Sequence, residues 1–177
     1  MLDETAILIL GWLREIGLGV RTAPLDGETF LPGVTLEASG LVVDPERLLY
    51  PGDLLHEAGH LAILLPEDRA RCGANAGADM GDEIAAQTWS YAAAIHLGLA
   101  PEVVFHEDGY KGSAHRLIEI YGAGNAGVPL LQWMGLAWAA SQAAKHEVAP
   151  YPHMIRWLRI NPEAPEPVDG TLPVLAK

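Results

Sequence analysis

Five consecutive residues constrain this chain more than any other feature: His56, Glu57, Ala58, Gly59 and His60 form an HExxH sequence. A helix turns by about 100° per residue, so the two histidines lie only about 40° apart around its axis and face the same side. Leucine and isoleucine residues on both flanks predict that this helix is buried. Two buried histidines and a glutamate need a partner that offsets their lost hydration, and a metal ion supplies one.

The third protein ligand must come from elsewhere, because a catalytic zinc site has three protein ligands and one position left for water. Three acidic residues near the start of the next predicted helix are available as ligands: Asp79, Asp82 and Glu83. Either aspartate has another role available, as a helix cap or as a partner of the outer nitrogen of a ligand histidine. Without a metal, the same pattern describes a core helix whose histidines bond to backbone or carboxylate groups.

Charge and cysteine content exclude several classes of protein. The 177 residues include 23 acidic and 11 basic ones, a formal net charge of −12, and this leaves no basic footprint for nucleic acid or for an anionic membrane surface. Cys72 is the only cysteine, so neither an intrachain disulfide nor a multi-cysteine metal site is available.

The N-terminus lacks the basic start of a signal peptide, and the apolar run 130–140 is too short to span a bilayer. We expect a soluble, cytoplasmic protein.

The order of the predicted elements indicates an α+β fold in which helices dominate. The segment 34–44 is the strand or hairpin candidate, and an all-α fold is the alternative if 20–44 is loop. Asp53 is the expected cap of the HExxH helix. Helices are expected at 3–17, 53–65, from Asp79 or Asp82 to about 97, 113–121, 129–145 and 152–159, with loops at 66–81 and 98–112. We expect one domain over 1–160, with a small sheet packed by the HExxH helix, and a proline-rich tail at 161–177.

The HEAGH sequence, followed by Glu83 within GDEIAAQ, resembles the zincin metallopeptidases, and specifically those of the gluzincin type. The resemblance covers roughly residues 50–97. The extended metzincin pattern is excluded, because Ile63 and Pro66 stand where its glycine and third histidine belong. Membrane-anchored ATP-dependent metalloproteases also carry HEAGH, but the chain has no phosphate-binding glycine loop, and that resemblance ends with the five residues.

The gluzincin resemblance implies a zincin-like fold and a zinc ion held by His56, His60 and Glu83. It further implies that the zinc lowers the pKa of a bound water and that Glu57 takes the proton as the water attacks a carbonyl. The donor to the resulting oxyanion is expected in the glycine-bounded loop FHEDGYKGSAH, as Tyr110 or His115.

The expected substrate is a peptide or protein, because zincins commonly add an extended peptide to a sheet edge, here the predicted strand at 34–44. Two other functions remain compatible with the sequence. One is a non-catalytic protein that keeps the metal as a structural support, and the other is a binding or regulatory module that acts through its acidic surface. Two histidines and a carboxylate also suit iron, nickel or manganese, so the residues alone do not select zinc.

Overall fold

The protein has a mainly helical α+β fold, as the sequence predicts. The computed structural model describes residues 2–38, 40–73 and 79–161. Within these ranges the chain forms eight α-helices, one short 3-10 helix and three strands: α1 (Glu4–Glu15), β1 (Gly19–Thr22), β2 (Val34–Glu37), β3 (Gly40–Val43), α2 (Asp53–Ile63), α3 (Pro66–Arg69), α4 (Met80–His96), η1 (Pro101–Val103), α5 (Glu107–Tyr110), α6 (Ala114–Gly122), α7 (Val128–Trp133) and α8 (Ala140–His146).

The three strands form one small mixed sheet in the order β1-β3-β2. β2 pairs with β3 antiparallel, with Val34 opposite Val43, which confirms the hairpin expected within 34–44. β1 pairs with β3 in parallel, from Gly19 opposite Gly40, so the region 20–44 is not all loop and the alternative all-α fold is excluded. All four residues of β3 are buried because this central strand packs on α2.

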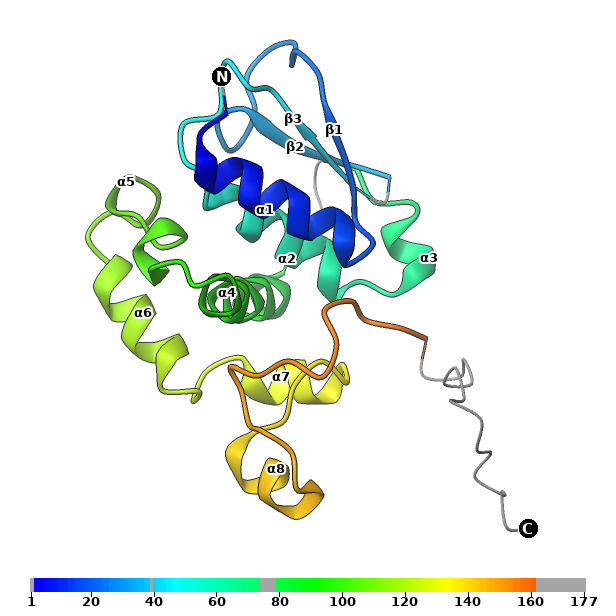
Figure 1. Cartoon of the computed structure of the whole chain (residues 1–177), viewed down its shortest axis with the longest axis vertical. Helices are drawn as coiled ribbons and strands as arrows, with labels where there is room; N and C mark the ends of the chain where they lie inside the picture. The colour runs from blue at the N-terminus through cyan, green and yellow to red at the C-terminus, as the bar shows by residue number, and fades with distance from the viewer. Residues whose placement is uncertain (1, 39, 74–78, 162–177) are drawn as a thin grey trace.

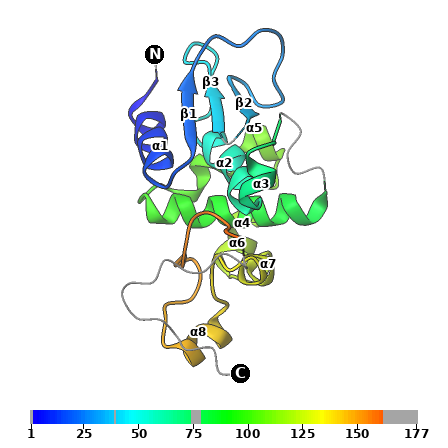
Figure 2. The same cartoon turned by 90° about the vertical axis from the view of Figure 1, so that its right-hand side faces the viewer.

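Helices cover the sheet on one side and continue in layers away from it. α1 packs on α2 and β1, and α2 packs on β2 and β3. α4 crosses beneath these two helices at a steep angle, since Figure 1 shows it end-on and Figure 2 shows its full length. α6 and α7 pack on α4 on the side away from the sheet, and α8 lies beyond them. This arrangement places α2 between the sheet and α4, where all eleven of its residues are buried.

A missing side chain at Gly59 allows α2 and α4 to approach closely. A Cβ atom at this position would lie 2.7 Å from the carbonyl oxygen of Ala86 and 3.1 Å from the hydroxyl of Ser90. That hydroxyl lies 3.0 Å from the carbonyl oxygen of Leu55, so it joins α4 to the backbone of α2. The glycine of the HExxH segment is therefore a packing requirement of the helix crossing.

Two arginines satisfy the carbonyl groups at the end of α2. The guanidinium of Arg69, on α3, is buried and donates to the carbonyl oxygens of Leu61 and Leu64, both at 2.8 Å. The backbone N–H of Arg159 donates to Ala62 at 2.8 Å. A helix end buried in this way needs such partners, and positive charge is favourable near it.

Several expected boundaries are wrong. Gly52, not Asp53, is the cap residue of α2, and the expected loop 66–81 contains α3. The helix expected at 129–145 is divided into α7 and α8, because Gly135 between them has φ +73°. The segment expected as a helix at 152–159 forms turns, with an isolated bridge between Met154 and Ala137.

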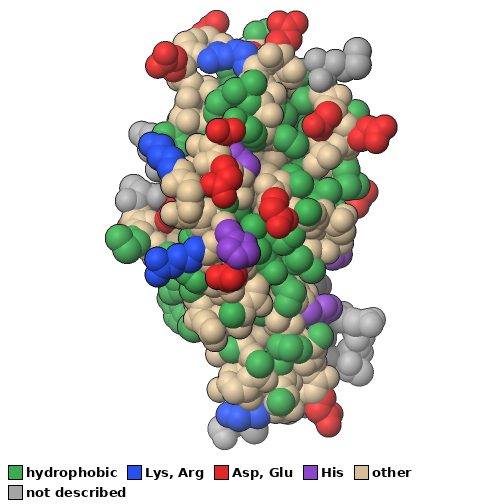
Figure 3. All heavy atoms as spheres, turned by 90° about the vertical axis from the view of Figure 1, so that its left-hand side faces the viewer, with side chains coloured by type: hydrophobic (Ala, Val, Ile, Leu, Met, Phe, Trp, Pro, Cys, Tyr) green, Lys and Arg blue, Asp and Glu red, His purple; other side chains and the backbone are tan. Residues whose placement is uncertain are grey.

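Charged side chains are dispersed on one face of the molecule. On the face shown in Figure 3, acidic and basic side chains are scattered among hydrophobic ones. No helix in the described ranges combines the length and apolar character that a bilayer crossing needs. Apart from Asn161, the tail expected at 161–177 lies outside the described residues.

We predict that Gly59→Ala lowers the free energy of unfolding by about 1–3 kcal/mol, because the new methyl group meets backbone atoms of α4. Gly11→Ala is the matched control, since a Cβ at this helical position has nothing within 4 Å. It should stabilise the protein by about 0.5–1 kcal/mol. Urea denaturation measures both changes, and equal effects of the two substitutions would contradict the close crossing.

Candidate metal centre

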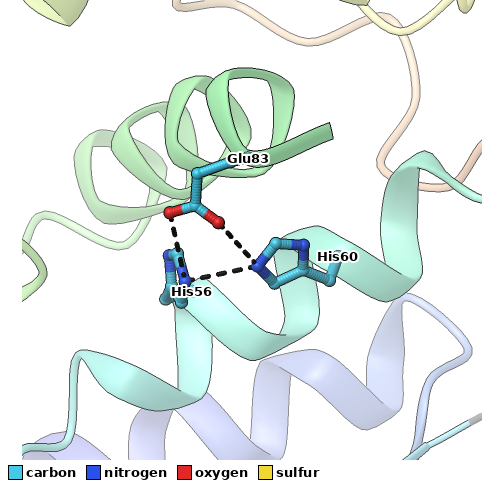
Figure 4. Close-up of side chains that lie close together, drawn as sticks. All are labelled: His56, His60 and Glu83. Atoms are coloured by element: carbon cyan, nitrogen blue, oxygen red, sulfur yellow. Dashed lines mark hydrogen bonds and ion pairs between the residues drawn. The ribbon is translucent and has the colours of Figure 1, made fainter. Parts of the chain in front are cut away.

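The two histidines of the HExxH segment point their Nε2 atoms toward one point. They stand one turn apart on α2, and their Nε2 atoms are 3.3 Å from each other. Both residues are buried, with exposed fractions of 7% for His56 and 5% for His60. Figure 4 shows the two rings directed toward the side of α2 that faces α4.

Glu83 approaches the histidines from the first turn of α4. Its Oε2 atom lies 3.3 Å from Nε2 of His60, and its Oε1 atom lies 3.7 Å from Nε2 of His56. The three candidate ligand atoms all lie within 4.8 Å of one another. In the part of the chain that the structure describes, no other three histidine, cysteine or acidic residues come together in this way.

These separations fit a divalent metal ion. Zinc–nitrogen and zinc–oxygen bonds of about 2.0–2.1 Å at tetrahedral angles place neighbouring ligand atoms about 3.3 Å apart. The distances among His56, His60 and Glu83 lie at or slightly above this value. The donor set, two imidazoles and one carboxylate, also leaves room for a fourth ligand.

The protonation states of two ligands also suit a metal ion. Burial is the main cause that lowers the pKa of His56 to about 4, so its imidazole is neutral at pH 7. A hydrogen bond from His60 is the main cause that lowers the pKa of Glu83 to about 2, so its carboxylate is ionised. Metal ligands must be deprotonated, and these two residues already are near neutral pH.

The two alternative ligands lie outside this cluster. The side chain of Asp79 caps α4 by accepting the N–H of Asp82 at 2.9 Å, and neither carboxylate belongs to the group with His56 and His60. The Nδ1 atoms of both histidines are buried and have no hydrogen-bond partner among the described residues, so neither aspartate has the expected role at an outer nitrogen.

Glu57 is buried beside the cluster. Its exposed fraction is 9%, and burial is the main cause that raises its pKa to about 7. The charges of Asp53 and Glu83 raise the pKa further, while His60 opposes them. A carboxyl group with a pKa near neutral pH is able both to accept and to release a proton.

The structure separates the two residues expected as oxyanion donors. Tyr110, at the end of α5, is half-buried, and after burial the charges of Glu83 and Asp53 are the main causes that raise its pKa. Its phenol therefore lies within electrostatic reach of the centre. The side chain of His115 is 84% exposed and pairs with Glu119 on its own helix, so the structure does not bring it to the cluster.

A polar contact that the sequence analysis missed fastens the α5 loop to the start of α2. Nε2 of His106 lies 3.0 Å from Oδ1 of the buried Asp53, and Nδ1 accepts the N–H of Gly109. Tyr50 stacks on the His106 ring at 3.9 Å and donates to Asp108. Because Gly109 donates to Nδ1, that nitrogen acts as an acceptor, and Nε2 is the nitrogen that donates to Asp53. The signal in the sequence that could have indicated this contact is Asp53, an acidic residue one helical turn before the glutamate of the HExxH segment.

Comparison of the chain with known protein families, with curated proteins and with solved structures finds no match. The described residues contain a cluster that is able to hold a metal ion. The resemblance to zincins rests on this cluster and on the HExxH sequence pattern.

We predict that Glu83→Ala removes most of the zinc affinity, because one of three protein ligands is lost. Zinc affinity should fall by more than the roughly 10–100-fold loss that follows removal of a group hydrogen-bonded to a metal ligand. Asp82→Ala is the control, since it changes an acidic residue of the same helical turn that lies outside the cluster. Competition with a chromophoric chelator measures both affinities. If Asp82→Ala costs as much affinity as Glu83→Ala, the assignment of the third ligand is wrong.

Proposed function

We propose that this chain is a zinc-dependent hydrolase that cleaves peptide bonds. The observation that carries the proposal is the convergence of His56, His60 and Glu83 at separations of 3.3–3.7 Å, with Glu57 on the same helix immediately after the first ligand. Tetrahedral spacing and a set of two nitrogens and one oxygen favour zinc over ions that prefer six oxygen ligands.

A bound zinc ion would supply Lewis-acid polarisation of the substrate carbonyl and a lowered pKa for the attacking water. In this mechanism the carboxylate of Glu57 accepts a proton from that water as the water oxygen bonds to the carbonyl carbon. Glu57 then delivers the proton to the nitrogen of the leaving amine as the C–N bond breaks. Burial raises the pKa of Glu57 to about 7 in the metal-free centre, and a bound cation would lower it, which favours the ionised carboxylate that a general base needs.

Tyr110 is the proposed donor to the oxyanion. Burial and the carboxylates near it hold the pKa of the phenol above its usual range, so the hydroxyl keeps its proton at neutral pH. It is then available to donate a hydrogen bond where negative charge develops. The fastening of the α5 loop by His106 and Asp53 limits the movement of this residue.

The proposed substrate is an extended peptide. β2 lies at an edge of the sheet, pairs only with β3 among the described strands, and packs on the metal-binding helix α2. A peptide that adds as a further strand to this edge would gain backbone hydrogen bonds close to α2.

A structural metal site is the second candidate function. It is favoured by the burial of His56 and His60 and by the placement of the ligands on two helices, because an ion there would tie α2 to α4. A protein of this kind would act as a binding or regulatory module and would have no need for a base at Glu57.

The substitution Glu57→Gln separates the two candidates. For a hydrolase we predict that zinc content stays at one per chain while turnover of an internally quenched peptide library falls by at least about 100-fold, because the base is lost. His60→Ala is the comparison, and it should remove both zinc and turnover. Unchanged turnover in Glu57→Gln, or no turnover in the zinc-loaded wild type, would favour the structural role.

We predict that Tyr110→Phe lowers kcat by about 10–1000-fold with little change in KM, because the hydroxyl is proposed to act on charge that develops in the transition state. Zinc affinity should be unchanged, since the residue is no ligand. An increase of KM at constant kcat would show that Tyr110 contributes to substrate binding and not to oxyanion stabilisation.

A further inference from the structure

The carboxylate of Glu83 also has a partner on its own helix, and through that partner a connection to α6. Gln87, one turn further along α4, donates from Nε2 to Oε1 of Glu83. The hydroxyl of Tyr121, on α6, bonds to Oε1 of Gln87 at 2.5 Å. Both residues are buried, with exposed fractions of 8% for Gln87 and 3% for Tyr121.

The chemistry of the three groups allows only one arrangement of their protons. An ionised carboxylate only accepts hydrogen bonds, so the NH₂ group of Gln87 must face Glu83. The amide oxygen of Gln87 then faces Tyr121, whose hydroxyl must donate. The chain Tyr121–Gln87–Glu83 is therefore directed, and each member fixes the orientation of the next.

We propose that Gln87 and Tyr121 are positioning residues that hold Glu83 as a metal ligand through Oε2. Oε1 is engaged by Gln87, while Oε2 is the oxygen nearer to a histidine, 3.3 Å from Nε2 of His60. This inference rests on the metal site of the proposed function.

Such support matters most for Glu83. Its side chain is 40% exposed, whereas those of His56 and His60 are 9% and 6% exposed. An exposed glutamate loses rotamer freedom when it binds an ion, and a partner that orders it beforehand removes part of that cost. A neutral amide is suited to this role, because it orders the carboxylate without adding charge to the centre.

Aromatic packing connects Tyr121 to the proposed oxyanion donor Tyr110. The ring of Tyr121 stacks on Phe105 with centroids 5.4 Å apart, and Phe105 contacts Tyr110 at 5.3 Å. Packing around Phe105 therefore holds both Tyr121, which begins the hydrogen-bond chain to Glu83, and Tyr110, the proposed oxyanion donor.

The test measures zinc affinity by chelator competition in the full chain, together with thermal unfolding of the metal-free protein. We expect Gln87→Leu to weaken zinc binding by about 10–100-fold, as loss of an outer partner does. Tyr121→Phe keeps the ring and removes the donor, so it should weaken binding by a smaller factor. Because Tyr121 acts through Gln87, Tyr121→Phe should have no further effect on zinc affinity when Gln87→Leu is already present.

Gln132→Leu is the matched control. Gln132 accepts the N–H of Ala139 in the connection after α7, so its loss affects that turn and leaves zinc affinity unchanged. Wild-type affinity in a folded Gln87→Leu variant would overturn the inference while leaving the metal site intact. Equal effects of Tyr121→Phe with and without Gln87 would overturn the relay. A wild-type chain that binds no zinc would overturn both this inference and the proposed function.

Discussion

The close crossing of α2 and α4 is the constraint on which the candidate centre depends. α2 is buried along its whole length, yet it carries Asp53, His56, Glu57 and His60. Burying such groups without partners is costly, so each needs a compensating contact. His106 provides such a contact for Asp53. Glu83 provides one for His56 and His60, and it reaches them only because α4 passes so close to α2. A metal ion would add a further partner for the two Nε2 atoms, whereas the buried Nδ1 atoms of both histidines have no hydrogen-bond partner among the described residues.

The surrounding structure keeps that crossing in place. Gly59 removes the side chain that would separate the helices, and Ser90 joins them by a hydrogen bond to the α2 backbone. Arg69 satisfies the carbonyl end of α2, while the contact of Asp53 with His106 anchors its beginning. The sheet covers the opposite side of the helix. Local geometry at the ligands is thus a consequence of contacts made by four other segments of the chain.

Sequence patterns predicted what depends on local periodicity. The placement of His56 and His60 on one helix face follows from the 3.6-residue period, and the fold class follows from the order of the helical segments together with the Val-, Leu- and Thr-rich segment 34–44. Features that the sequence did not predict correctly depend mostly on contacts between residues far apart in the chain. β1 forms only because β3 lies beside it, and Asp53 serves His106 rather than a helix cap. His115 shares the glycine-bounded segment with Tyr110 but stands on the exposed face of α6. The helical recurrence of apolar residues at 114, 117, 118 and 121 was the local signal that places His115 on the solvent side.

X-ray absorption spectroscopy of the zinc-loaded full chain identifies the ligands that bind the ion. We expect nitrogen and oxygen ligands at about 2.0–2.1 Å from the zinc, with the scattering signature of two imidazoles and no sulfur at about 2.3 Å. A sulfur contribution from Cys72, or a shell with fewer than two imidazoles, would show that zinc binds elsewhere. Either result would contradict a centre built from His56, His60 and Glu83 at the crossing of α2 and α4.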